Sequence, residues 1–325
     1  MLCFVEITWL HWAGFIACLL LFLSLDIGFF HREAHVVKFR EAFWWTVLWI
    51  SLALLFALGL RSTRGEKESL EFLTGYLLEL SLSMDNVFVI ALIFTYFRVP
   101  SQYQHRVLFW GVLGAILMRG AMIGLGVVLI SWLAWILYVL GAFVLYTGVR
   151  MLFHDPEVHP EKNRVVILAR KLYPVTPHLD GQRFTTTWQG RRALTPLALV
   201  LLLVETTDLI FAVDSIPAIF AVTTKPFIVF TSNMFAILGL RSLYFVLVGA
   251  IGYFRFLNVG LSLVLIFIGA KMLLDPHGHE PKWFQLEIST STSLMVVATI
   301  IMASILVSVI TMRLQKTKPN RTPPG

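Results

Sequence analysis

Apolar stretches follow one another along almost the whole chain, and each is about as long as a bilayer is thick. Outside the hinges, nearly every segment of about 20 residues is hydrophobic enough to cross a hydrocarbon core of roughly 30 Å. Hydrophobic residues make up 58% of the 325 residues, charged residues only 14%, and the mean hydropathy is +0.79. A soluble protein needs a more highly charged surface. The sequence therefore predicts an all-α polytopic membrane protein and excludes cytosolic enzymes, disordered chains and disulfide scaffolds.

Charge clusters and Pro or Gly hinges divide the chain into about nine predicted transmembrane helices. These are residues 7–30, 42–60, 70–96, 106–130, 133–152, 195–222, 227–252, 257–274 and 288–312. The same divisions predict an N-terminal two-span segment (1–69), a first three-helix repeat (70–152), a loop (153–194), a second three-helix repeat (195–276) and a final span with a basic tail (277–325). The first stretch lacks a basic n-region and a small-residue cleavage signal, so we interpret it as a retained span.

The net charge of +7 reports membrane orientation rather than a nucleic-acid partner, because most Lys and Arg residues lie in short loops between apolar spans. With nine spans, the loops on one side hold roughly three times as many basic residues as those on the other. The positive-inside rule then places the N-terminus outside and the C-terminus in the cytoplasm. The loop 153–194 falls on the cytoplasmic side and is too short for an independent domain. Its segment 162–173 is either a basic amphipathic helix on the anionic leaflet or a solvated connector.

Two parts of the chain resemble each other. Residues 79–91 align with residues 208–220, and each segment places two carboxylates six residues apart in an apolar stretch. The next spans carry Arg119 and Arg241 at corresponding positions, and residues 146–156 align with residues 267–276. Each repeat contains three spans, and an odd number of crossings makes the second copy enter from the opposite face. The sequence thus predicts an inverted three-plus-three repeat, which is typical of secondary transporters; a duplicated static scaffold is the alternative.

Six acids are predicted to lie inside spans, namely Asp26, Glu79, Asp85, Glu205, Asp208 and Asp214. A charge at the bilayer centre costs about 3 kcal/mol, so such groups persist only if they are paired, protonated, hydrated or bound to a cation. Arg119 and Arg241 can neutralise only two of them as structural or gating counter-charges. A divalent cation together with protons would relieve the remaining surplus. This surplus is the main argument from the residues for cation binding.

Helix geometry refines the predicted site. Asp85 points about 120° away from Glu79, so one straight helix cannot aim both carboxylates at one ion. In the second copy, Pro217 is expected to kink the helix and to bring Asp208, Asp214 and the Val213 carbonyl around one site. Asn86 offers an amide oxygen beside Asp85 in the first copy.

The predicted ligands are oxygen atoms, which suit hard divalent cations such as Mg²⁺, Ca²⁺ and Mn²⁺. His and Asp residues in two loops, at 154–159 and 275–280, have metal-ligand chemistry but are also typical of hydrated turns. No nucleotide-binding, dinucleotide-binding or haem-attachment motif occurs. We therefore expect no cofactor and no enzymatic activity.

The stretches LSMDNVFV (82–89) and ETTDLIFAVDSIPA (205–218) resemble the paired signatures of the TerC family of integral membrane proteins, and the whole layout resembles its Alx-like branch. The resemblance implies a multi-pass protein of the bacterial inner membrane that is associated with manganese export, in a family named for tellurium resistance. By motif position it implies ion-handling roles for Glu79, Asp85, Asn86, Glu205, Asp208 and Asp214, with Asp26 as a further acidic position.

The leading hypothesis is a secondary transporter that exports Mn²⁺ from cytoplasm to periplasm, with proton exchange on the same carboxylates. The alternative is a metal-binding membrane scaffold or stress sensor that does not itself transport. The expected partners are a divalent metal ion and the lipid bilayer, and the sequence assigns no oligomeric state.

Overall fold

The computed structural model describes residues 7–30, 38–133, 135–153, 163–248, 256–275 and 288–317, without the side chains of 25–30, 257 and 312–317. The predicted His and Asp positions at 154–159 lie outside these residues, as do 276–280 of the second loop and the tail beyond 317.

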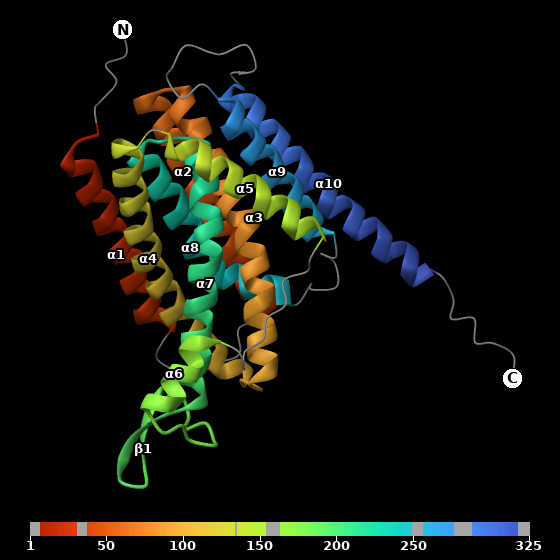
Figure 1. Cartoon of the computed structure of the whole chain (residues 1–325). Coiled ribbons are helices and arrows are strands. Elements are labelled where there is room, and N and C mark those ends of the chain that lie inside the picture. The colour runs from red at the N-terminus through yellow and green to blue at the C-terminus, as the bar shows by residue number, and fades with distance from the viewer. Residues whose placement is uncertain are drawn as a thin grey trace, which may run out of the picture.

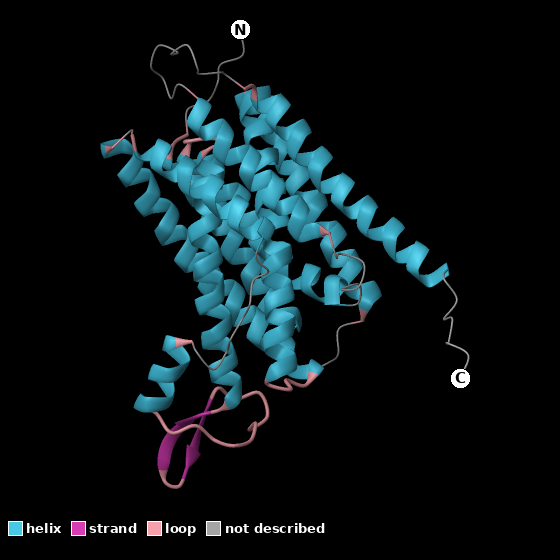
Figure 2. Ribbon diagram, turned by 45° about the vertical axis from the view of Figure 1, so that its right-hand side comes forward, coloured by secondary structure: helices cyan, strands magenta, loops and turns pink. Residues whose placement is uncertain are grey.

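Helices dominate the described chain, which confirms the all-α fold (Figures 1 and 2). Nine of them form the bundle: α1 (Trp9–Phe30), α2 (Phe39–Arg64), α3 (Glu66–Tyr96), α4 (Ser101–Trp132), α5 (Ile136–Phe153), α7 (Pro196–Phe220), α8 (Pro226–Val248), α9 (Leu257–Leu274) and α10 (Thr290–Thr317). A short helix, α6 (Arg164–Leu172), and a hairpin of β1 (Thr185–Trp188) and β2 (Arg191–Leu194) lie at one end.

Seven of the helices in the described residues are long and apolar enough to cross a membrane: α2, α3, α4, α5, α7, α8 and α10. The remaining two bundle helices contain shorter apolar stretches, Trp9–Ser24 and Asn258–Leu274. A multi-pass membrane protein is therefore established, whereas the count of nine spans stays a prediction.

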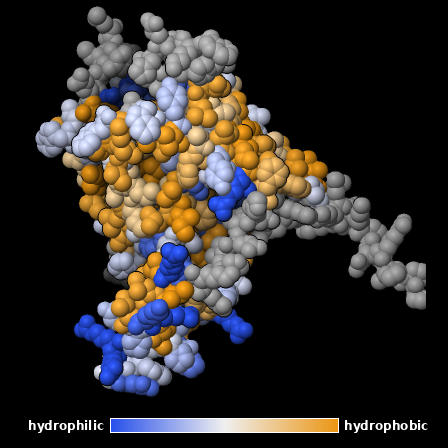
Figure 3. All heavy atoms as spheres, in the orientation of Figure 1, coloured by the Kyte–Doolittle hydropathy of each residue, from blue (hydrophilic) through white to orange (hydrophobic). Residues whose placement is uncertain are grey.

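The face of the bundle seen in Figure 3 is largely apolar, with large hydrophobic patches. Leu117 and Leu125 of α4 are each 68% exposed, which a bilayer tolerates because lipid tails are as apolar as these side chains. At the centre lie α3 and α8, whose most apolar windows are 61% and 67% buried inside the protein, against 44% for α7 and 22% or less for α2, α4, α5 and α10. Polar side chains of α3 and α8 are consequently shielded from lipid by neighbouring helices.

The closest helix crossing joins α5 to α9, the third helices of the two predicted repeats. A Cβ on Gly148 would lie 2.8 Å from the backbone nitrogen of Ile266, and a Cβ on Gly269 would come still closer to the backbone nitrogen of Leu145. Gly148 aligns with Gly269 in the repeat, and Leu145 aligns with Ile266, so the two contacts are reciprocal. Reciprocal contacts are the mark of a two-fold axis.

The direction of this crossing also matters. Gly141, earlier in α5, approaches Met272, later in α9, whereas Gly148 approaches Ile266. The two helices therefore run antiparallel, which is the relation that an inverted repeat requires of equivalent helices. This geometry supports the inverted repeat, which itself stays a prediction.

The segment between the repeats is more ordered than a solvated connector. The Asn163 side chain accepts hydrogen bonds from the backbone N–H groups of Val165 and Val166 and so caps α6. The hairpin turn is Gln189–Gly190, with φ of 50° and 73°, the left-handed pair that a tight two-residue turn uses. The sequence analysis missed the hairpin, although a Thr-rich run followed by Gln-Gly was the available signal.

The α5–α9 crossing yields a prediction about stability. Gly269→Ala should lower the midpoint temperature of thermal unfolding in detergent, because the new Cβ meets backbone rather than a flexible side chain; such overpacking costs about 1–3 kcal/mol. Gly124→Ala is the matched control, since a Cβ there meets nothing within 4 Å. The control should melt at or slightly above the wild-type temperature. Equal melting temperatures for both variants would contradict the described crossing.

Candidate functional site

A buried arginine on α4 joins the two predicted repeats. The Arg119 guanidinium is 1% exposed and contacts the Glu79 carboxylate of α3, which is 2% exposed, through Nη1. Its Nη2 donates to Asp208 Oδ1 of α7 at 2.9 Å, and its Nε donates to Asp208 Oδ2 at 3.4 Å. Glu79 and Asp208 occupy equivalent positions in the repeat. One guanidinium thus serves two equivalent carboxylates at the centre of the bundle.

Two smaller polar side chains complete this cluster. Asn86 Nδ2 of α3 donates to Asp208 Oδ1 at 3.1 Å, and Arg119 Nη1 lies 3.4 Å from Ser215 Oγ of α7. Asn86 and Ser215 are again equivalent in the repeat. The Asn86 amide oxygen has no hydrogen-bond partner within the described chain. It is therefore available to a donor or cation that reaches the cluster.

Asp85 is buried at 5% exposure but does not join Arg119. Among the described residues its Oδ1 has no hydrogen-bond partner, and neither has the buried hydroxyl of Ser83. A desolvated acceptor without a partner costs about 1–3 kcal/mol, and a charged one costs more. Such a group can accept a proton or a cation.

Asp214, the repeat equivalent of Asp85, has a different environment. It is half-buried, and it accepts a hydrogen bond from Thr147 Oγ1 of α5 at 3.3 Å, with Arg150 near enough to attract its charge. The α9 residue that aligns with Thr147 is Ile268, which has no hydroxyl group. The first copy thus supplies a hydroxyl donor to Asp214, whereas the aligned residue of the second copy has none to offer to Asp85. Thr147 was missed by the sequence analysis; its replacement by Ile in the second copy was the signal.

Glu205 of α7 lies against a glycine of α4. A Cβ built on Gly114 would fall on the Glu205 carboxylate, so the glycine leaves the space that this side chain fills. Glu205 is half-buried and lies close enough to Asp208 for the two charges to repel. Glu205 therefore lies beside the Arg119 cluster.

The last two predicted positions are described in less detail. Asp26 belongs to α1, but its side chain lies outside the described residues. Arg241 lies on α8 and is half-buried.

The five predicted acids whose side chains are described do not form one cage. In the described part of the chain, no three His, Cys, Asp or Glu side chains come together as a metal-binding group. The expectation that Pro217 would gather Asp208, Asp214 and the Val213 carbonyl is wrong, because Asp208 bonds to Asn86 and Arg119 whereas Asp214 bonds to Thr147. Residues six apart therefore keep facing different neighbours: Asp208 faces α3 and α4, and Asp214 faces α5.

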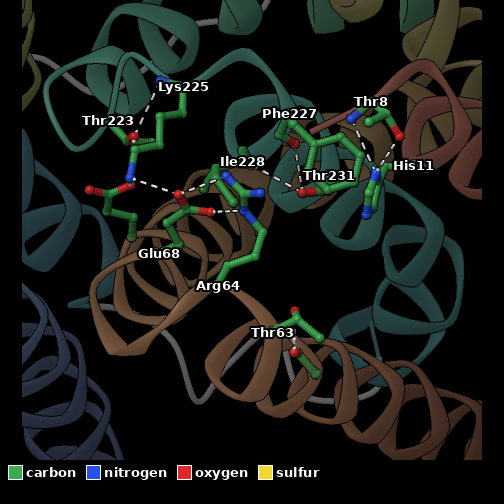
Figure 4. A network of polar contacts seen from close by, with 12 residues as sticks. Thr8, His11, Thr63, Arg64, Glu68, Thr223, Lys225, Phe227, Ile228 and Thr231 are labelled. Atoms are coloured by element: carbon green, nitrogen blue, oxygen red, sulfur yellow. Dashed lines mark hydrogen bonds and ion pairs between the residues drawn. The ribbon is translucent and has the colours of Figure 1, made fainter. Parts of the chain in front are cut away.

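A second polar network ties together one end of the bundle (Figure 4). Glu68 of α3 is paired with Arg64 of α2 and, at 3.1 Å, with Lys225 from the loop between α7 and α8. Lys225 also lies 3.2 Å from Glu71, which accepts a hydrogen bond from Thr223 at 2.9 Å. These contacts were missed by the sequence analysis, which placed Glu68 outside the third span and assigned no role to Glu71.

The opposite end is closed by apolar packing. Glu68 and Glu71 align in the repeat with Leu197 and Val200, which are fully buried in a cluster with Phe94 and Tyr244. Equivalent segments thus make an ionic contact at one end and a hydrophobic contact at the other.

Comparison with known proteins places this chain in a family. Residues 64–316 match the model of the integral membrane protein TerC family. An "uncharacterized membrane protein" of Myxococcus xanthus is 51% identical over 93% of this chain and 92% of its own length. Proteins named "Putative membrane-bound redox modulator Alx" from Photorhabdus laumondii and Escherichia coli K12 are 48% and 47% identical over 84% of this chain and 88% of theirs. No solved structure matches.

The Arg119 cluster predicts a strong effect on stability. Arg119→Met should lower the unfolding midpoint temperature markedly, because removing one partner of a buried ion pair costs about 3–5 kcal/mol. Adding Glu79→Gln and Asp208→Asn removes the stranded charges and should recover much of that loss. The measurement is thermal unfolding of the purified variants in the same detergent. A single variant as stable as the wild type, or a triple variant no better than the single one, would refute the shared ion pair.

Proposed function

Because this chain belongs to the TerC family of integral membrane proteins, we propose that it is a secondary transporter of a divalent cation, and that it exports Mn²⁺ from the cytoplasm to the periplasm. The proposal concerns the cargo, the direction of transport and the residues that bind the ion.

The observation that carries the proposal is the excess of buried acid over buried base. Arg119 is shared by Glu79 and Asp208, so this cluster holds one more carboxylate than cation. Asp85 adds a buried carboxylate oxygen that has no hydrogen-bond partner in the described residues. Uncompensated charge of this kind is costly in a membrane, and a structural ion-pair network would be balanced. A bound cation or proton restores the balance.

The available ligands favour a hard cation. Carboxylate oxygens of Glu79, Asp85 and Asp208, the Asn86 amide oxygen and the Ser83 hydroxyl are all on buried residues. Oxygen ligands of mixed type suit Mg²⁺, Ca²⁺ and Mn²⁺. The choice of Mn²⁺ among these ions, and its export, follow from the family resemblance described above. Proton exchange on the same carboxylates would supply the coupling.

The inverted repeat supplies a mechanism for alternating access. In such proteins one half moves against the other around a fixed site, and the two end states are related by exchanging the conformations of the halves. Here Arg119 of the first half binds both equivalent acids. After the exchange, Arg241 would lie between Asp208 and Glu79. Each arginine would then act in turn as the counter-charge that the cation displaces.

The two ends of the bundle fit such a cycle. Opening the ionic end requires Lys225 to separate from Glu68 and Glu71, and water can solvate the separated charges. Opening the other end separates the apolar cluster that contains Leu197 and Val200.

Transport can be tested in inside-out vesicles. The wild type should accumulate Mn²⁺, in competition with Mg²⁺, Ca²⁺ and Zn²⁺ tested in parallel across a pH gradient. Asp85→Asn and Asp214→Asn should each abolish uptake while the protein still inserts, because each removes a negative charge from inside a spanning helix. Glu66→Gln is the control, since the Glu66 side chain is 68% exposed and pairs only loosely with Arg61. Normal uptake by both aspartate variants would count decisively against the proposal.

The second candidate function is a metal-binding scaffold or stress sensor. The observation that favours it is the folded unit of α6 and the hairpin, which a transporter core does not require. Replacing residues 160–190 by a neutral linker should leave Mn²⁺ flux largely intact if the protein transports. A sensor would lose its function with this replacement. The redox role in the relatives' name does not discriminate between the two.

Gly114 offers a finer test of the site. Gly114→Ala should reduce Mn²⁺ uptake severalfold, because its Cβ displaces the Glu205 carboxylate without changing any charge. The displaced group is the end of a flexible side chain, so the unfolding temperature should change little. Gly124→Ala in the same helix is the control and should transport normally. Unchanged Mn²⁺ uptake by Gly114→Ala would show that the Glu205 carboxylate does not take part in ion transport.

A further inference from the structure

We propose that α6 docks onto the anionic headgroup layer of the membrane through a stripe formed by Val165, Leu168 and Leu172. The proposal concerns an interaction surface outside the bundle and does not depend on the proposed transport function.

The stripe is apolar, continuous and exposed. Its three residues are spaced by three and four positions, so they lie within about 60° of one another around the helix. They are 40%, 55% and 66% exposed in chain order. The adjoining side of α6 is already occupied, because Val166 is 2% exposed and Ala169 packs against the same apolar cluster. Packing against the bundle therefore fixes which face of α6 points outward.

Basic side chains border the stripe. At 100° per residue, Arg164 and Lys171 lie beside Leu168 on the side away from the buried face. Between residues 163 and 195 there are six basic residues and one acidic residue, Asp180. Asp180 is itself paired with Arg183 at 3.8 Å. The surface thus combines an apolar edge with a positive charge, which is the pattern of helices that lie in the headgroup region of anionic bilayers.

The position of α6 places this stripe at the membrane boundary. α6 packs on α7, one of the helices long and apolar enough to span the bilayer. Val166 shares a buried cluster with Leu197 and Val200, which lie in the first turns of α7 (Figure 1). Figure 3 shows strongly hydrophilic and apolar residues side by side at this end of the molecule. The lipid-facing exterior and the stripe therefore meet at the same end of α7.

A lipid surface fits better than a protein partner. A stable protein interface buries about 800 Å² on each side, and three aliphatic side chains fall far short of that area. Contact with a bilayer does not require such a large buried area, because the spanning helices already hold α6 beside the membrane at high effective concentration. Even a small apolar stripe then stays in contact.

The test uses a fluorescent probe at the centre of the stripe. In a Cys3→Ser/Cys18→Ser background, Leu168→Cys carries an environment-sensitive dye, and Arg191→Cys on the exposed hairpin carries the same dye as control. The whole protein is reconstituted into phosphatidylcholine vesicles with and without phosphatidylglycerol. With phosphatidylglycerol, emission at position 168 should shift to the blue and iodide quenching should fall severalfold relative to position 191.

Charge neutralisation provides the second arm. Adding Arg164→Gln and Lys171→Gln should abolish the difference between the two lipid compositions at position 168, and circular dichroism would verify that the protein is still folded. If the dye at position 168 is quenched as strongly as the dye at position 191 in phosphatidylglycerol vesicles, the proposal is overturned. The stripe would then be a surface for a protein partner. Protection that does not depend on lipid charge would overturn the assignment to anionic lipid.

Discussion

The buried ion pairs of Arg119 hold together the two halves of this protein. Its guanidinium is shielded from both lipid and water, and it bonds to Glu79 in the first half and to Asp208 in the second. In a low-dielectric interior these contacts are far stronger than the same contacts would be at a surface, and removing one partner leaves a buried charge without compensation. The helices α3, α4 and α7 are consequently held at one relative rotation, and that rotation decides where the neighbouring polar groups point.

The sharing is also unbalanced, and this imbalance links structure to function. The single guanidinium of Arg119 lies between two carboxylates at aligned positions, so a net negative charge remains where the halves meet. The carboxylate of Asp85 adds to this negative charge nearby. An arrangement built for stability alone would replace such groups by apolar side chains of similar size, which is often neutral or stabilising. Retaining them is understandable if an ion or proton is bound and released there. The family to which the chain belongs is compatible with this view.

Departures from the repeat carry as much information as the repeat itself. Thr147 satisfies Asp214, whereas Ile268 at the aligned position cannot bond to Asp85. Glu68 and Glu71 form ion pairs at one end, whereas Leu197 and Val200 pack at the other. The two halves, whose helices align in sequence, thus differ in which polar groups have hydrogen-bond or ion-pair partners.

The sequence by itself determined the class of protein, and it predicted the approximate spans, the acids inside them and their equivalence between the two halves. These follow from hydropathy and spacing, which are local properties of the chain. It did not determine which acids meet. From the chain alone, Pro217 is expected to bring Asp208 and Asp214 together. Only the packing of α7 against α3, α4 and α5 decides that the two carboxylates face different helices. That packing depends on the rotation and crossing of whole helices, set by contacts between residues far apart in the sequence, such as Gly148 with Ile266 and Gly269 with Leu145.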